Sequence, residues 1–368
     1  MTQSPLARPI PFTPAVETVS PDEAETNRAL AEVFETIITK THADLGHAQR
    51  GVHAKSHALL RAELTVRPDL PTELRQGIFA EPGRTYPALV RISTTPGDPL
   101  RDSVSLPRGI AIKVIGVEGD RLPGSERDVT QDFLMATAPV FSAPDAKGFL
   151  QVLKLLAATT DRAEWAKAAL SATLRPLEKG LEALGTESAL LKGLGGYPRT
   201  HPLGERYFTQ AASRFGACMA KLDLQAASDN FRALVGQEID YAGRENALRE
   251  EVADLLARQG GAWTLGAQLC RDLEANPIED ASRPWAEEAN PYLALATLVV
   301  PAQDSWTAPR SQAMDDEMSF NPWHGIEAHR PLGNIMRARR HVYPVSAGLR
   351  SHLNGCPIHE PRSVPALG

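Results

Sequence analysis

The chain has little of what marks several large classes of protein. It has only three cysteines, Cys218, Cys270 and Cys356, an odd number at wide spacing, which argues against a disulfide framework and against a zinc pattern. Residues 1–16 are proline-rich and contain no apolar run, so neither a signal peptide nor a membrane span is expected. The formal charge of −6 gives no reason to expect a nucleic-acid partner. These features predict a cytoplasmic protein.

The composition instead indicates a globular chain with a substantial core. Of its 368 residues 42% are hydrophobic and 23% are charged, values that argue against disorder. Residues 1–19 are interpreted as an arm lying over the surface or over a partner subunit, and residues 20–368 as one domain. Strands and helices follow one another without regular βαβ alternation, which favours an α+β fold with an antiparallel sheet. Helices are expected at 21–44, after 142–145, at 161–190 and at 245–258, and strands at 59–66, 88–94, 110–117, 216–224, 263–273 and 293–300.

A tyrosine flanked by arginines near the C-terminus is the most informative feature. On a helix, Arg339, Tyr343 and Arg350 fall within about 40° of one another. A guanidinium one turn away favours ionised phenolate, an uncommon species in proteins that serves as an axial ligand to haem iron. The simpler alternative is an amphipathic helix with solvated basic residues and a half-buried Tyr343.

Several segments in a fixed order change the balance between these alternatives. They are residues 50–55, 90–94, 107–113, 240–241, 263–268, 320–322, 325–327, 331–333 and 339–344. Together they resemble the haem catalase superfamily, and within it the compact catalase-related peroxidases. The resemblance implies an antiparallel eight-stranded β-barrel surrounded by helices. Because the chain ends 25 residues after Tyr343, it is expected to lack the C-terminal helical domain of full-length catalases.

The resemblance also assigns roles around a ferric haem b. Tyr343 would be the axial iron ligand, with Arg339 beside it, and His53 the distal acid–base residue, which suits an imidazole near neutral pH. Ser93 would orient His53. Arginine pairs with carboxylates in a bidentate manner, which explains the residue type expected at the haem propionates. The remaining cofactor-binding residues implied are Arg50, Arg91 and Arg350 at the propionates, Phe141 over the haem face, and Val52.

Two departures from the family pattern bear on activity. Catalases pair the distal histidine with an asparagine, and the corresponding position here is Asp128, or Val129 or Thr130 after a small shift; an ionised aspartate cannot donate a hydrogen bond. Catalases also carry an acidic residue at the channel, where this chain has Leu106. We therefore expect a haem peroxidase that reduces organic hydroperoxides with an organic electron donor and dismutates hydrogen peroxide weakly.

Other readings remain open. A catalase-related isomerase of fatty-acid hydroperoxides, like allene oxide synthase, would share the scaffold, although such enzymes carry Thr where this chain has Val52. A non-catalytic haem carrier or sensor would use the same tyrosine ligation but would not need His53 and Ser93. A haem-free structural relative is a third possibility. The resemblance further implies a homo-oligomer.

Overall fold

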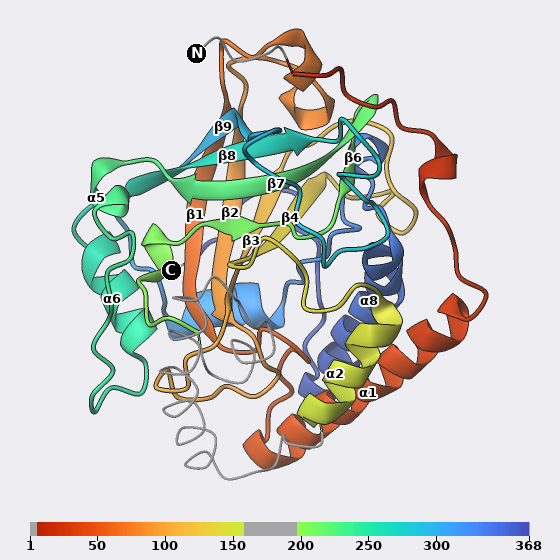
Figure 1. Cartoon of the computed structure of the whole chain (residues 1–368). Helices are drawn as coiled ribbons and strands as arrows, with labels where there is room; N and C mark the ends of the chain where they lie inside the picture. Colours follow the sequence, from red (N-terminus) through yellow and green to blue (C-terminus); the bar gives the residue numbers. More distant parts are fainter. Residues whose placement is uncertain (1–5, 158–196, 368) are drawn as a thin grey trace, which may run out of the picture.

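A closed antiparallel β-barrel forms the centre of the computed structural model, which describes residues 6–157 and 197–367 (Figure 1). The helix expected at 161–190 lies outside these residues. Eight strands close the ring in the order β1-β2-β3-β4-β5-β7-β8-β9, and β9 returns to β1. A ninth strand, β6, continues from β7 outside the ring. The bounds are β1 Ser56–Val66, β2 Thr85–Thr94, β3 Arg108–Ile115, β4 Thr130–Ala136, β5 Tyr207–Phe208, β6 Ser213–Phe215, β7 Cys218–Ala226, β8 Gly261–Leu269 and β9 Leu293–Val300.

Alternation along the strands separates the inside of the barrel from its outer face. Leu60, Val90 and Ile112 belong to the large cluster that fills the interior. Their neighbours point outward, and Leu59 and Leu89 join a second cluster. That cluster also contains Met314, Met318, Phe320 and Leu367. The outer face of β1 to β4 is therefore covered by later parts of the chain. A binding site between the barrel and these parts would be shielded from solvent.

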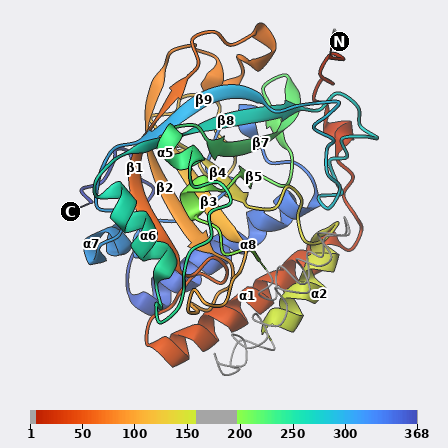
Figure 2. The ribbon, with the colours of Figure 1, turned by 60° about the vertical axis from the view of Figure 1, so that its left-hand side comes forward.

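Three helices lie together on one side of the barrel, as Figures 1 and 2 both show. They are α1 Glu23–Leu45, α2 Ala146–Ala157 and α8 Asn334–Asn354, and their apolar faces share one cluster. The remaining helices are short: α5 Asp229–Arg232, α6 Ala247–Leu256 and α7 Ala308–Ser311, the π-helical turn η5 Gln312–Asp316, and the 3₁₀ turns η1 Pro14–Val16, η2 Thr72–Leu74, η3 Gly77–Phe79, η4 Pro202–Gly204 and η6 Glu327–His329. None of the helices in the described ranges is long and apolar enough to span a bilayer.

The predicted elements that fall on described residues match the observed ones, with differences at their ends. The first helix begins at Glu23 rather than at residue 21, because Asp22 occupies the N-cap position. β8 ends at Leu269, four residues before the predicted end. β4 was not among the predicted strands, because Gln131 and Asp132 interrupt its apolar pattern. The α+β class and the eight-stranded barrel are confirmed.

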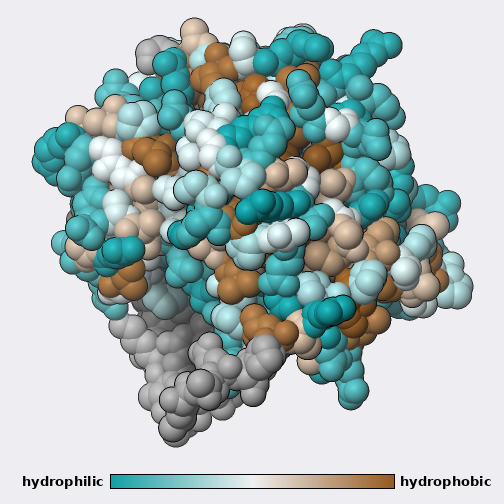
Figure 3. Space-filling view, turned by 90° about the horizontal axis from the view of Figure 1, so that it is seen from above, coloured by the Kyte–Doolittle hydropathy of each residue, from teal (hydrophilic) through white to brown (hydrophobic). Residues whose placement is uncertain are grey.

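The N-terminal arm lies against its own chain. The amide of Ile10 donates to the carbonyl of Cys270 at 2.8 Å, and that of Phe12 to the carbonyl of Ala217 at 2.8 Å. Ile10, Phe12 and Val16 pack against a small buried cluster there. The face of the molecule in Figure 3 is mostly hydrophilic, with apolar residues in small separate groups.

Candidate functional site

His53 lies in the loop before β1, against the outer face of the barrel. Its backbone has a φ of 55°, in the left-handed region that side chains rarely adopt. Its Nδ1 is 3.2 Å from the Oγ of Ser93 on β2. Ser93 pairs across the sheet with Gly109 on β3, and a Cβ at Gly109 would lie 2.5 Å from Cε1 of His53. The barrel surface thus holds the imidazole at one edge, and only glycine fits beneath it.

The surroundings of His53 keep its imidazole neutral. Burial, and then the positive charges of Arg91, Arg339 and Arg50, lower the pKa of His53 to about 3. A neutral imidazole has one nitrogen that donates and one that accepts. With Nδ1 beside Ser93, Nε2 is the nitrogen left to exchange a proton with a substrate. A neutral imidazole can accept a proton at neutral pH.

The three arginines predicted to bind propionates come together at one place. Arg91 Nε and Arg50 Nη1 donate to Oδ1 of Asp315 at 2.7 and 3.0 Å. Arg350 donates to the backbone carbonyls of Asp315 and Asp316 in η5, and to that of Met318 at 3.2 Å. The sequence analysis assigned all three arginines to the same ligand. It did not single out Asp315, because no motif surrounds that residue.

This arginine cluster has more positive charge than its own carboxylate balances. Arg91 and Arg350 are 3% and 2% exposed, so water screens them little. Burial lowers the pKa of Arg350 to about 10, although the carboxylates of Asp315 and Asp316 act in the opposite direction. Its Nε is buried without a hydrogen-bond partner among the described residues. The three guanidinium groups still outnumber the carboxylates of Asp315 and Asp316 that act on them, so they fit a ligand that brings further carboxylate, as the propionates of haem would supply.

Helix α8 closes the site from the other side. The guanidinium of Arg339 lies 5.6 Å from the centre of the Phe141 ring, and its charge acts on His53. Val52 and Phe141 pack on the cluster that contains Ala338 and Val342 of α8. The loop of His53, the segment of Phe141 and the expected proximal helix therefore meet.

Tyr343 lies one helical turn beyond Arg339, on the side of α8 that faces residues 319–324. It lines a cavity of about 420 Å³ with Phe320, Trp323 and His324. No hydrogen bond within the described residues joins Arg339 to Tyr343, and Arg339 contacts Met336 Sδ at 3.6 Å. The cavity lining does not include His53. Tyr343 is nevertheless on the predicted helix and borders a space of the size that binds small ligands.

Asp128 is not placed beside His53. It precedes β4, and burial followed by the charge of Glu360 raises its pKa, with His324 and Arg121 as further charged neighbours. On the ladder, the β4 residue opposite Gly109 is Ala136. The structure gives no geometric support for Asp128 in the place of the distal asparagine, because the start of β4 lies at the far end of β3 from His53.

A buried ionic quartet lies next to the Tyr343 cavity. Lys113 Nζ is 2.7 Å from Oδ1 of Asp132 and also donates to Glu360, while His324 Nδ1 is 3.1 Å from Glu360. Asp132, His324 and Glu360 have the spacing of metal ligands. The ammonium of Lys113, however, bonds both carboxylates and balances their charge with His324. The quartet is therefore best described as an ion-pair network that ties residues 356–367 to the barrel.

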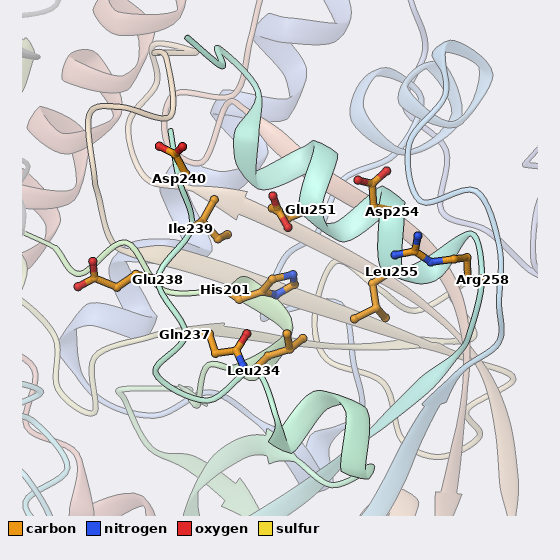
Figure 4. A pocket seen from close by; sticks show the side chains of 10 residues that line it. All are labelled: His201, Leu234, Gln237, Glu238, Ile239, Asp240, Glu251, Asp254, Leu255 and Arg258. Atoms are coloured by element: carbon orange, nitrogen blue, oxygen red, sulfur yellow. The ribbon is translucent and has the colours of Figure 1, made fainter. Parts of the chain in front are cut away.

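A second cavity, of about 240 Å³, lies between residues 234–240 and α6 (Figure 4). His201 faces it, with Glu251 and Leu255 of α6 opposite. His201 Nδ1 already accepts from the amide of Leu203 at 3.2 Å. The cavity shares no residue with the His53 site and adds nothing to its chemistry.

Comparison with known proteins places the fold but not the family. The sequence matches no family model and no curated protein. Among solved structures, the chain resembles catalase A from Saccharomyces cerevisiae with a TM-score of 0.60, 14% identity, and coverage of 95% of this chain and 68% of that one. It also resembles a fungal catalase (0.59, 15% identity, 98% and 70%) and a bacterial catalase (0.55, 17% identity, 88% and 63%). The chain has a catalase-like fold.

Proposed function

We propose that the protein is a haem-dependent oxidoreductase that reduces organic hydroperoxides with an organic electron donor. The observation that carries the proposal is the neutral His53, fixed at Nδ1 by Ser93 and adjoining a buried arginine cluster with uncompensated positive charge. An acid–base residue beside a site for a dianion is what a haem peroxidase needs and what a purely structural barrel does not.

Residues from both sides of the site would hold the cofactor. Tyr343 would ligate the iron through its phenolate oxygen, and Arg50, Arg91 and Arg350 would bind the propionates. Val52 and Phe141 would pack against the macrocycle. When bound, ferric haem b would supply the redox chemistry, which no side chain of this chain can provide.

The protein's own contribution is the movement of one proton. The Nε2 atom of His53 would accept the proton of the hydroperoxide and return it to the departing oxygen. Ser93 keeps Nδ1 engaged, so the ring presents the same nitrogen throughout. Because the pKa of His53 is about 3, the ring stays available as a base across the physiological pH range.

The loop between β2 and β3 favours an organic substrate. Leu106 stands where the resemblance puts the acidic channel residue of catalases, and it forms a small buried apolar cluster with Leu100 and Val104. An apolar lining binds an alkyl chain better than it binds hydrogen peroxide, since burying apolar surface is favourable. This supports reduction of larger hydroperoxides over dismutation of hydrogen peroxide.

The test begins with the haem-free protein and added hemin. We expect the protein to take up hemin stoichiometrically. The absorption spectrum of the bound haem should change in Tyr343→Phe. His53→Ala should keep its haem, but its hydroperoxide turnover should be lower by about 10²–10⁴-fold. Failure to take up hemin would refute the proposal, and equal turnover in His53→Ala would indicate a haem carrier.

Substrate and product distinguish the remaining alternatives. With cumene hydroperoxide and a phenolic donor, the expected products are the alcohol and oxidised donor. An allene oxide or ketol from a polyunsaturated fatty-acid hydroperoxide would identify an isomerase instead. Oxygen evolution from hydrogen peroxide at rates typical of catalase would contradict the predicted preference.

A further inference from the structure

We propose that Asp315 is a positioning residue that fixes the His53 loop on the barrel by way of Arg91. The proposal rests on the proposed function only in treating His53 as the acid–base residue. Asp315 would not touch substrate or cofactor in this role. It would act by holding the groups that do.

All four acceptor positions of the Asp315 carboxylate are in use. Oδ1 accepts from Arg91 Nε at 2.7 Å and from Arg50 Nη1 at 3.0 Å. Oδ2 accepts from Ser56 Oγ at 2.7 Å and from Ser311 Oγ at 3.0 Å. The carboxylate therefore ties together the loop before β1, the start of β1, β2 and the turn from α7 into η5. Its orientation is fully determined by these contacts.

Arg91 passes this constraint on to His53. Its Nη2 donates to the carbonyl of His53 at 2.8 Å and to that of Ala54 at 3.1 Å. The left-handed φ of His53 is unfavourable for a residue with a side chain, so the surrounding contacts must maintain it. Arg91 supplies two of these contacts, and Asp315 holds the guanidinium that makes them. Ser93, two residues along the same strand, holds the ring.

The neighbouring Asp316 provides a contrast on the same turn. Its carboxylate pairs with Nε2 of His47 at 2.9 Å, where the His47 side chain is 42% exposed. It makes no side-chain contact with Arg91 or Arg50 among the described residues. The two aspartates are neighbours in sequence and carry the same charge. Of the two, only Asp315 hydrogen-bonds Arg50 and Arg91, whereas Asp316 contacts the loop at His47, six residues before His53.

The experiment compares Asp315→Asn with Asp316→Asn in the full-length, haem-free protein by hydrogen–deuterium exchange. The reporter is the amide of Ala54, which donates to the carbonyl of Pro96 at 3.0 Å. We expect exchange at residues 53–56 to accelerate about tenfold or more in Asp315→Asn and to stay at the wild-type rate in Asp316→Asn. Equal rates in the two variants would overturn the proposal.

A second variant covers the case in which Asp315→Asn does not fold. Arg91→Lys keeps the charge, but one ammonium cannot span Asp315 and both carbonyls. It should loosen residues 53–56 in the same way, and an unchanged exchange rate there would count against the proposal.

A further readout separates positioning from general support of the fold. Diethyl pyrocarbonate should modify His53 faster in Asp315→Asn than in Asp316→Asn. The rate is measured relative to that of the exposed His352 in the same molecules. Equal relative rates in the two variants would argue against a positioning role. Both measurements need no haem. If the wild type takes up no hemin, the proposed function fails while the exchange data still decide the role of Asp315.

Discussion

Adding one methyl group at Gly109 should displace His53 without removing any polar group. In Gly109→Ala, the new Cβ would lie 2.5 Å from Cε1 and 2.7 Å from Nδ1 of the imidazole. Carbon atoms in ordinary contact are about 3.5 Å apart, so the ring must withdraw by about 1 Å. That movement also lengthens the 3.2 Å contact between Nδ1 and Ser93 Oγ.

The expected effect on reactivity is much larger than the effect on stability. A misplacement of about 1 Å in a catalytic group costs roughly 10²-fold in rate. Overpacking by one methyl group costs about 1–3 kcal/mol in unfolding free energy, which a protein of this size tolerates. We therefore expect Gly109→Ala to fold and bind hemin but to reduce cumene hydroperoxide about 100-fold more slowly.

Stopped-flow absorbance with hemin-loaded protein measures this rate. Gly348→Ala is the matched control, because Gly348 is an exposed position of α8 where a Cβ would meet nothing within 4 Å. Alanine there should stabilise the helix by up to about 1 kcal/mol. In a His53→Ala background, Gly109→Ala should have no further effect on the rate. A wild-type rate in Gly109→Ala, or an undiminished effect without His53, would refute the reasoning.

Two further predictions concern stability. Burial lowers the pKa of His201 and of His329 to about 4, and burial with nearby arginines lowers that of His53 to about 3. Below pH 6.5 the unfolded chain therefore takes up protons at these histidines that the folded chain does not. Urea titrations from pH 7 to 4 should show a loss in unfolding free energy of about 1.4 kcal/mol per histidine per pH unit, and a flat profile would contradict this. Glu360→Gln should lower the unfolding free energy by on the order of 3 kcal/mol, because it leaves Lys113 buried with one carboxylate, whereas Glu63→Gln on β1 should change it little; equal effects would show that the quartet contributes nothing.

The sequence predicted the parts of the site that depend on local pattern. Alternating strands placed Arg91 and Ser93 on one face of β2, two residues apart, where both reach His53. Helical spacing placed Arg339, Tyr343 and Arg350 on one helix, and α8 contains all three. Their roles around a haem remain predictions, because the comparisons establish the fold alone.

The parts of the site that the sequence analysis missed depend on contacts between segments far apart in the chain. Asp315 lies in a π-helical turn, and its importance comes from Arg50 and Arg91, more than 200 residues away in the chain. Gly109 was recognised as part of a motif, but its need for empty space appears only when His53 is packed on it. Asp128 was placed by its resemblance to the distal asparagine of catalases, whereas the strand register sets Ala136 opposite Gly109.

The barrel is closed by a strand of only two residues. Tyr207 and Phe208 pair with β7 on one side, and Phe208 alone pairs with β4 on the other. A sheet that ended at β4 and β7 would present rows of unpaired amide and carbonyl groups, on which a second molecule can add a strand. Strand β5 closes this sheet into a barrel through the backbone hydrogen bonds of only two residues. Closure removes the exposed edges and so protects the protein against edge-to-edge aggregation.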